Sequence, residues 1–284
     1  MEKNLNTPDS LAELMVQSGV KKANTPFLKV ILLGIIAGAF IALGAESSNL
    51  AVHGISNVGI ARTIAGLMFP TGLILIILVG GELFTGNCLI AGAVIDHKVP
   101  CYRLITNLIL VYFSNMIGSV CIAALVYGSG QFDYSQGGLG AYTIKVAVGK
   151  VGIDANQAIL SGVLCNILVC FAIIAAFSAK DVIGKIFAAF FPIWVFVISG
   201  FEHCVANMYY IPAGMMAAQN PKYVEAAQSL YGLTEEQISN LSISGMIHNL
   251  LPVTIGNIIG GAICVAGFYY CIYMIRWGKK KEEK

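Results

Sequence analysis

Charged residues are scarce in this sequence, and their scarcity excludes most soluble folds. Asp, Glu, Lys and Arg make up 11% of the 284 residues, whereas 57% are hydrophobic. Ordinary soluble domains carry about 25% charged residues. The composition therefore predicts an integral membrane protein that lies in a lipid bilayer. The net charge is only +2 and the positive residues lie at the ends and in a few loops, so nucleic acid is not an expected partner.

Signals for cofactors, metals and export are also absent. The eight cysteines include no Cys-x-x-Cys pair and lie mostly in apolar runs, which is typical of reduced, buried thiols. No second histidine or carboxylate stands at metal-ligand spacing on the helix face of His203. No ATP-binding motif occurs, and no nucleophile–base pair or metal cluster suggests an enzyme. The polar N-terminus lacks the apolar segment of a cleavable signal peptide. We expect neither a cofactor nor an enzyme.

Long apolar segments are what the sequence has instead. A span needs about 20 apolar residues. Only Arg62, Lys145, Lys150 and Lys222 of the 17 Lys and Arg residues lie outside if both termini are cytoplasmic, and the positive-inside rule favours that orientation. We predict a cytoplasmic amphipathic helix within residues 1–26, a six-span domain over 27–276 and a basic cytoplasmic tail over 277–284. The predicted spans are 27–52, 62–95, 104–128, 157–178, 184–218 and 244–275.

The second and fifth spans are interrupted in the same way, which indicates an internal repeat. Each contains Gly-x-Glu-x4-Asn, and the third and sixth spans share Asn-x7-Asn-x2-Gly. Three spans per half place the halves in opposite orientations, with the repeats at about 27–130 and 150–276. The fold class is therefore all-α, as a 3+3 inverted repeat with broken second and fifth spans. The shared positions are Gly80, Glu82, Asn87, Asn107, Asn115 and Gly118 in one half, and Gly200, Glu202, Asn207, Asn249, Asn257 and Gly260 in the other.

The two breaks predict a site near the middle of the membrane. Unwound backbone is tolerated there only where it faces protein or a water-filled cavity, and the free N–H groups of the following half-helix favour an anion. Asn87 and Asn207 could cap the second half-helices. Glu82 and Glu202 could accept hydrogen bonds from the freed backbone, or they could handle protons directly.

His203 and Thr85 occupy equivalent places in the two breaks. His203 is the one histidine in the middle of an apolar run, and histidine changes charge near neutral pH. The Thr85 hydroxyl can donate a hydrogen bond to an anion. We expect both to line a pore. Phe69, Leu73 and Phe196 precede the breaks and could form an apolar gate, although such residues are also ordinary core.

Three stretches carry a resemblance to a known family. They are LFTGN at 83–87, GVLCNILVC at 162–170 and SGFEHCVANMYYIP at 199–212. Together and in this order they resemble the formate/nitrite transporter family along essentially the whole chain. The resemblance implies an aquaporin-like homo-pentamer with one pore per protomer, which passes small inorganic or carboxylate anions of weak acids.

The resemblance also assigns residues to roles. Cys204 departs from the serine that is common after the family's histidine. The implied positions are His203 as the central histidine, Thr85 as the loop threonine, Lys150 as a vestibule lysine, Asn166 and Asn207 as polar pore residues, and Phe69, Leu73, Leu83 and Phe196 as constrictions.

The resemblance is closest to the family's hydrosulfide-channel branch, and it implies a hydrosulfide channel of the cell membrane, with formate as the alternative main substrate and nitrite as a further permeant. An anion held between Thr85 and His203 would be protonated through His203 and cross as the neutral acid. Plain anion conduction, with His203 only a hydrogen-bond donor, stays open. A neutral-solute channel of aquaporin type is less favoured, because its paired Asn-Pro-Ala half-helices are absent.

Overall fold

The computed structural model describes residues 5–275, so the predicted tail at 277–284 lies outside the described residues. The first half of the chain forms seven helices between Pro8 and Gly128. They are α1 (Pro8–Ala23), α2 (Phe27–Val52), α3 (Val58–Met68), α4 (Thr71–Val79), α5 (Phe84–Asn87), α6 (Ile90–Ile95) and α7 (Cys101–Gly128).

The second half repeats this order with one insertion. A 3₁₀ segment, Gln131–Gly137, leads into it. The insertion consists of α12 and α13, which have no counterpart before α7. The helices are α8 (Gly138–Val151), α9 (Ala155–Ser178), α10 (Val182–Ser199), α11 (Cys204–Ala217), α12 (Pro221–Tyr231), α13 (Glu235–Ser239), α14 (Ile243–Ile258) and α15 (Phe268–Met274), with a π-helical stretch, Ile259–Gly267, joining the last two.

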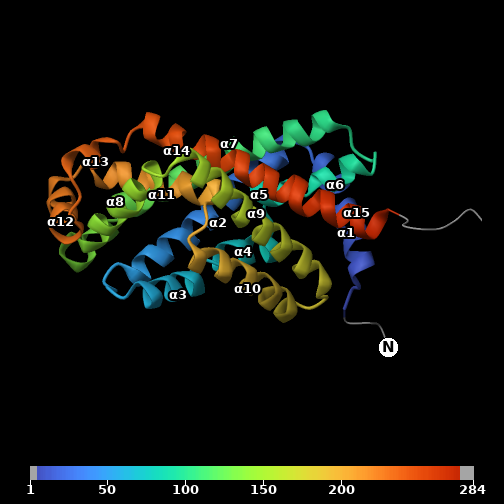
Figure 1. Ribbon diagram of the computed structural model, residues 1–284, viewed down its shortest axis with the longest axis horizontal. Helices are drawn as coiled ribbons and strands as arrows, with labels where there is room; N and C mark the ends of the chain where they lie inside the picture. The colour runs from blue at the N-terminus through green and yellow to red at the C-terminus, as the bar shows by residue number, and fades with distance from the viewer. Residues whose placement is uncertain (1–4, 276–284) are drawn as a thin grey trace, which may run out of the picture.

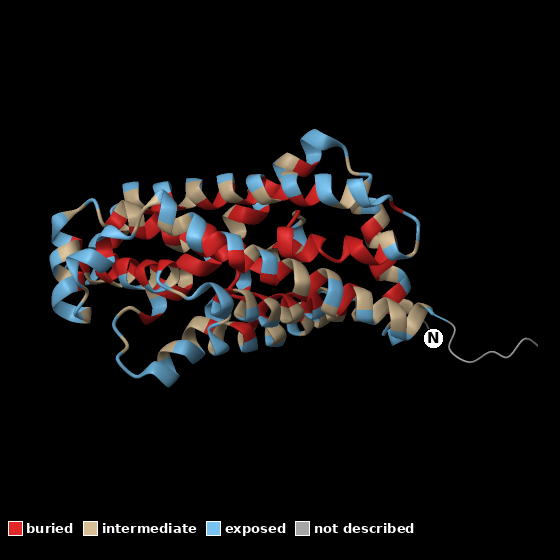
Figure 2. Cartoon of the chain, turned by 45° about the horizontal axis from the view of Figure 1, so that its top comes forward, coloured by how far each residue is buried: buried red, intermediate tan, exposed pale blue. Residues whose placement is uncertain are grey.

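Within residues 5–275, six helical stretches are long and apolar enough to cross a membrane, one in each predicted span. The prediction of a six-span all-α membrane fold is therefore confirmed. Figure 1 shows α8, α12 and α13 at one end of the elongated bundle and α1 with α15 at the other. Buried residues run along the middle of the bundle, and exposed residues gather on its loops and outer faces (Figure 2).

Both predicted breaks are present, and a glycine begins each one. The chain leaves α4 at Gly80, where φ is 106°, and leaves α10 at Gly200, where φ is 71°. Only glycine adopts such angles without steric cost. Extended residues follow until α5 and α11 begin at Phe84 and Cys204. The Gly-x-Glu motif therefore marks the ends of the first half-helices.

The repeated glycines of the third and sixth spans allow helices to pack closely. A Cβ placed on Gly118 would lie 2.0 Å from the Ile35 carbonyl oxygen of α2. A Cβ on Gly260 would lie 2.4 Å from the Val163 carbonyl oxygen of α9. The contacts are equivalent in the two halves. The shared glycines thus hold the first and third spans of each half together.

Three features of the fold differ from the prediction. Residues 138–151 form helix α8 rather than part of a loop, and α12 and α13 follow the fifth span. The second span is divided at Phe69 and Pro70, between α3 and α4, although both residues keep helical dihedral angles. Phe69 and Leu73, predicted as constriction residues, therefore lie on the two sides of this division.

Candidate functional site

The two breaks meet at a hydrogen bond between Thr85 and His203. Thr85 Oγ1 lies 2.9 Å from His203 Nε2, and the two residues are 0% and 2% exposed. Thr85 lies in the first turn of α5, and His203 is the N-cap residue of α11. Each side chain comes from one half of the repeat, so the contact joins the halves at their centre.

The hydrogen bonds of His203 fix which ring nitrogen carries the proton. Nδ1 accepts a hydrogen bond from the backbone N–H of Ala206 at 3.1 Å, which caps α11. An accepting Nδ1 has no proton, so the neutral ring is protonated at Nε2. Nε2–H then donates to Thr85 Oγ1. The Thr85 hydroxyl hydrogen stays available for a further acceptor, such as an anion.

Two asparagines from the third and sixth spans hold the broken backbone. Asn115 Oδ1 accepts from the Phe84 N–H at 2.9 Å, and Asn257 Oδ1 accepts from the Cys204 N–H at 3.0 Å. Their amide nitrogens donate to the carbonyl oxygens of Glu82 and of Glu202, at 2.9 and 3.0 Å. Buried polar backbone needs such partners.

Asn166 lies beside this centre and also binds backbone. Its Nδ2 donates to the carbonyl oxygen of Thr85 at 3.2 Å and to that of Asn257 at 2.6 Å. Asn166 is fully buried on α9. It therefore positions the Thr85 turn rather than presenting its amide to an open space.

On the α8 side, Lys150 and Glu202 form a largely buried ion pair. Lys150 Nζ lies 2.5 Å from Glu202 Oε1, and the two side chains are 19% and 6% exposed. Asn207 Nδ2 donates to Glu202 Oε2 and to Asn249 Oδ1, both at 2.7 Å. Asn249 Nδ2 donates to the Lys150 carbonyl oxygen at 2.8 Å. The Lys150–Glu202 pair is thus closed into a network by two amides.

The α1 side carries the same network from equivalent residues. Lys22 Nζ lies 2.8 Å from Glu82 Oε2 and 2.9 Å from Asn87 Oδ1. Asn87 Nδ2 donates to Glu82 Oε2 and to Asn107 Oδ1, at 2.6 and 2.7 Å. Lys22 comes from α1 as Lys150 comes from α8. The inverted repeat therefore includes α1 and α8 as well as the spans.

These contacts correct the predicted break-capping role of Glu82, Asn87 and Glu202. The carboxylates of Glu82 and Glu202 bind lysine and asparagine side chains rather than freed backbone N–H groups. Asn115, Asn257 and His203 bind those N–H groups instead. Lys150, expected in a loop, lies in the last turn of α8 and is paired.

Lys22 was missed by sequence reasoning, although one signal could have found it. Lys22 precedes the first span as Lys150 precedes the fourth. Extending the repeat one element upstream of each half would have paired the two lysines. The asparagines at 107, 115, 249 and 257 were recognised as repeat markers but not as site residues.

The predicted constriction residues lie on both sides of the central pair. On the α8 side, the rings of Phe69 and Phe196 meet edge to face with centroids 5.3 Å apart, and Phe196 lies 5.9 Å from the His203 ring. Both phenylalanines line a cavity of about 150 Å³ together with His203 and Lys150, named here the α8-side cavity. The Phe69–Phe196 pair therefore forms an apolar part of this cavity's wall, directly beside His203.

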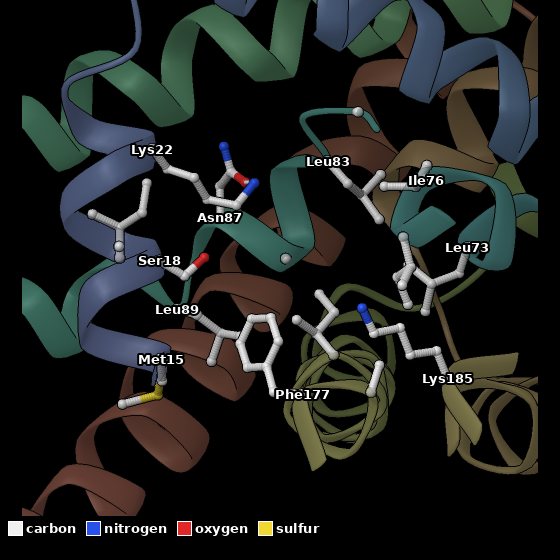
Figure 3. A pocket seen from close by; sticks show the side chains of 17 residues that line it. Met15, Ser18, Lys22, Leu73, Ile76, Leu83, Asn87, Leu89, Phe177 and Lys185 are labelled. Carbon is white, nitrogen blue, oxygen red and sulfur yellow. Dashed lines mark hydrogen bonds between the residues drawn. The ribbon is translucent and has the colours of Figure 1, made fainter. Parts of the chain in front are cut away.

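Leu73 and Leu83 lie on the other side. They line a cavity of about 190 Å³ that also contacts Lys22 and Asn87, named here the α1-side cavity. Figure 3 shows both leucines at one wall of this cavity, with α1 forming the opposite wall. Among residues 5–275, no group of three or more His, Cys, Asp or Glu side chains is placed to hold a metal ion.

Two inverted three-span units, whose broken helices meet at buried polar side chains between two cavities, define a membrane transport protein. The family model for formate/nitrite transporters matches residues 9–271, and the chain belongs to that family. The predicted family resemblance is confirmed.

Known relatives agree with this assignment. The chain is 34% identical over 276 residues to the formate channel FocA of Escherichia coli K12, covering 95% of both proteins. It is 36% identical over 269 residues to FocA of Haemophilus influenzae, covering 92% of this chain and 93% of that protein. These relatives are channels rather than enzymes, as predicted for this chain.

Solved structures share the fold. A pentameric formate channel with formate bound matches with a TM-score of 0.76 and 33% identity, covering 88% of this chain and 98% of that one. An FNT family ion channel matches with a TM-score of 0.77 and 26% identity, covering 92% and 98%. These descriptions lend no support to the predicted leaning toward hydrosulfide.

Proposed function

We propose that this chain is a formate channel that also passes other small monovalent anions of weak acids. The observation that carries the proposal is the Thr85–His203 pair, which offers a buried hydroxyl donor where two half-helices meet. A carboxylate oxygen is a natural acceptor for that donor. Relatives over 30% identical are formate channels, which favours formate over hydrosulfide as the main substrate. By the same likeness, the chain assembles as a homo-pentamer.

The hydrogen bonds of His203 favour one of the two mechanisms that the sequence left open. Protonating Nδ1 would set its N–H against the Ala206 N–H and break the α11 cap. Passing the Nε2 proton from the neutral ring would leave an imidazolate. We therefore assign His203 the role of a hydrogen-bond donor acting through Thr85. The proton that converts formate to formic acid is then taken from hydronium in the surrounding solution, which leaves water behind.

The apolar pairs then select the species that crosses. Placing a charge in a membrane interior costs several kcal/mol, about 2.5–3.5 kcal/mol on insertion scales. Phe69–Phe196 and Leu73–Leu83 offer no polar side chain to a passing anion. We propose that the permeant is stabilised as an anion at Thr85 and passes the apolar pairs with its charge neutralised.

Orientation follows from the lysine and arginine distribution. We propose that the α1 side faces the cytoplasm of a bacterial-type inner membrane and that the α8 side faces outward. In this arrangement the amphipathic helix within 1–26 and the tail at 277–284 are cytoplasmic, and 27–276 form the channel domain. Lys222 is exposed on α12, at the α8 end of the protein. Thiol labelling of a Lys222→Cys variant in intact cells tests the orientation, because this position should be reached from outside.

Flux through liposomes tests the substrate. Purified protein in proteoliposomes is given formate, nitrite, hydrosulfide and chloride side by side at one concentration and pH. We expect formate to enter fastest and chloride, whose acid is strong, to enter slowest. If hydrosulfide entered much faster than formate, hydrosulfide would be the main substrate, as the sequence analysis expected.

The apolar pairs predict a change in size selectivity. Leu73→Ala and Phe196→Ala each remove bulk from one pair, and lactate, which we expect the wild type to exclude, is expected to pass through the variants. Removing a large buried side chain costs about 2–5 kcal/mol of stability, so intact assembly is checked first by size-exclusion chromatography. Lactate uptake into proteoliposomes is the measurement. Unchanged exclusion of lactate in both variants would remove the gate assignment.

A further inference from the structure

The α1-side cavity contains a second lysine that takes no part in the networks described above. Lys185 lies at the fourth position of α10 and lines this cavity opposite α1. Figure 3 shows its amino group pointing into the cavity, while the Ser18 hydroxyl points in from α1. Two donors from elements far apart in the sequence thus face one enclosed space.

The charges around the cavity leave Lys185 uncompensated. Lys22 is paired with Glu82 at 2.8 Å, but Lys185 has no carboxylate within ion-pair distance among residues 5–275. No carboxylate lines the cavity, and its remaining wall is mainly apolar. An uncompensated cation beside low-dielectric walls raises the local concentration of anions.

Lys185 does not stabilise helix α10 from the position that it occupies there. The N-terminus of a helix carries partial positive charge, so a lysine near it is unfavourable. Asp181 supplies the helix cap, accepting from the Gly184 N–H at 2.7 Å. The Asp181 carboxylate therefore binds backbone, and it forms no ion pair with Lys185. Neither helix capping nor ion pairing explains Lys185, so we look for its role in the binding of an anion within the cavity.

We propose that Lys185 and Ser18 form a binding subsite for a small monovalent carboxylate in the α1-side cavity. One carboxylate oxygen accepts from Lys185 Nζ and another from Ser18 Oγ, because both side chains point into the cavity. The subsite lies on the approach to Leu73 and Leu83, which line the same cavity. It holds the anion before the apolar pair. The proposal rests on the proposed function for the identity of the anion.

Formate uptake kinetics in proteoliposomes of the full chain test the subsite. Lys185→Gln removes the charge and is expected to raise the half-saturating formate concentration about fivefold at low ionic strength, the effect of one charge at about 4 Å in a watery cavity. Lys185→Arg is expected to restore most of the affinity. Ser18→Ala is expected to raise the same constant about twofold, on the low side for one hydrogen bond.

Salt dependence separates charge from structure. In concentrated salt the screening length falls to about 3 Å, so the Lys185→Gln defect should shrink toward the wild type. A packing defect would persist. Lys180→Gln, an exposed lysine five residues away, is the matched control and should match the wild type throughout.

The outcomes are distinguishable. An unchanged half-saturating concentration in Lys185→Gln, or a rise that salt does not reduce, overturns the subsite while wild-type formate uptake still supports the proposed function. A wild type that carries no formate overturns the proposed substrate instead. The same Lys185 comparison is then made with nitrite or chloride, whichever the wild type carries, and the same two results decide it.

Discussion

Replacing His203 with phenylalanine is expected to abolish most formate flux while leaving the protein folded. Phenylalanine keeps the ring that packs 5.9 Å from Phe196, and it removes the Nε2 donor to Thr85. Without this donor the Thr85 hydroxyl loses the partner that directs its hydrogen toward the anion, and a hydrogen bond to a charged group contributes about 1.5–3 kcal/mol, a factor of about 10–100 in rate. The lost Ala206 cap adds about 1 kcal/mol of destabilisation.

Formate uptake into proteoliposomes across a range of pH is the measurement for His203→Phe. His248→Phe is the matched control, because His248 is exposed on α14 and lines neither cavity. We expect the control to follow the wild type at every pH. If the uptake curves of His203→Phe and the wild type matched, His203 would act only in packing, and its proposed role as a hydrogen-bond donor would be wrong.

Replacing Lys150 with methionine is expected to produce the largest loss of stability. Glu202 would be left buried without its cation, and removing one partner of a buried ion pair costs about 3–5 kcal/mol. Lys22→Met should cost somewhat less, because the Lys22 side chain is 27% exposed against 19% for Lys150, and water weakens its attraction to Glu82. The two carboxylates are almost equally buried, so the difference between the losses is expected to be small.

The temperature at which the detergent-solubilised oligomer is lost from a size-exclusion profile measures this effect. The double variant Lys150→Met/Glu202→Gln removes both charges and should recover much of the loss. If Lys150→Met kept the wild-type transition temperature, the ion pair would have no structural role. Equal losses for the single and double variants would show that packing, not the unpaired carboxylate, causes the defect.

The spans and breaks could be predicted because their signals lie along the chain. About 20 apolar residues in succession define a span regardless of what packs against it. Gly80 and Gly200 mark the breaks because their positive φ angles favour glycine. Inverted symmetry then placed Thr85 and His203 in equivalent positions before any contact was known. The roles proposed for them stay predictions until the flux measurements are made.

The partners of the polar residues could not be predicted in the same way. Glu82 and Glu202 sit beside freed backbone in the sequence, but folding brings lysines from α1 and α8 against them. Helix α8 is short and follows a glycine-rich turn, so a search for membrane spans passes over it. Lys22 looked like one of many cytoplasmic lysines. Only tertiary packing showed that α1 belongs to the repeat.

The division of the second span at Phe69 and Pro70 was hidden for a similar reason. Proline is common near the start of a helix, and here Pro70 stands at the N-cap of α4 shortly after α3 ends. The apolar run continues without interruption from α3 through α4. Hydropathy therefore indicates one span, and it gives no sign that Phe69 and Leu73 line different cavities.

The central claim is that a small carboxylate passes through the Thr85–His203 contact, and an isosteric change at Thr85 tests it most directly. Thr85→Val keeps the shape of the fully buried side chain and removes only its hydroxyl. The measurement is the initial rate of labelled formate uptake into proteoliposomes, for the wild type, for Thr85→Val and for protein-free liposomes. We predict rapid uptake by the wild type and a loss of about tenfold or more in Thr85→Val, comparable with His203→Phe, because the hydroxyl that donates to the charged anion is removed. Equal rates for the wild type and Thr85→Val, or a wild type no faster than protein-free liposomes, would contradict the account.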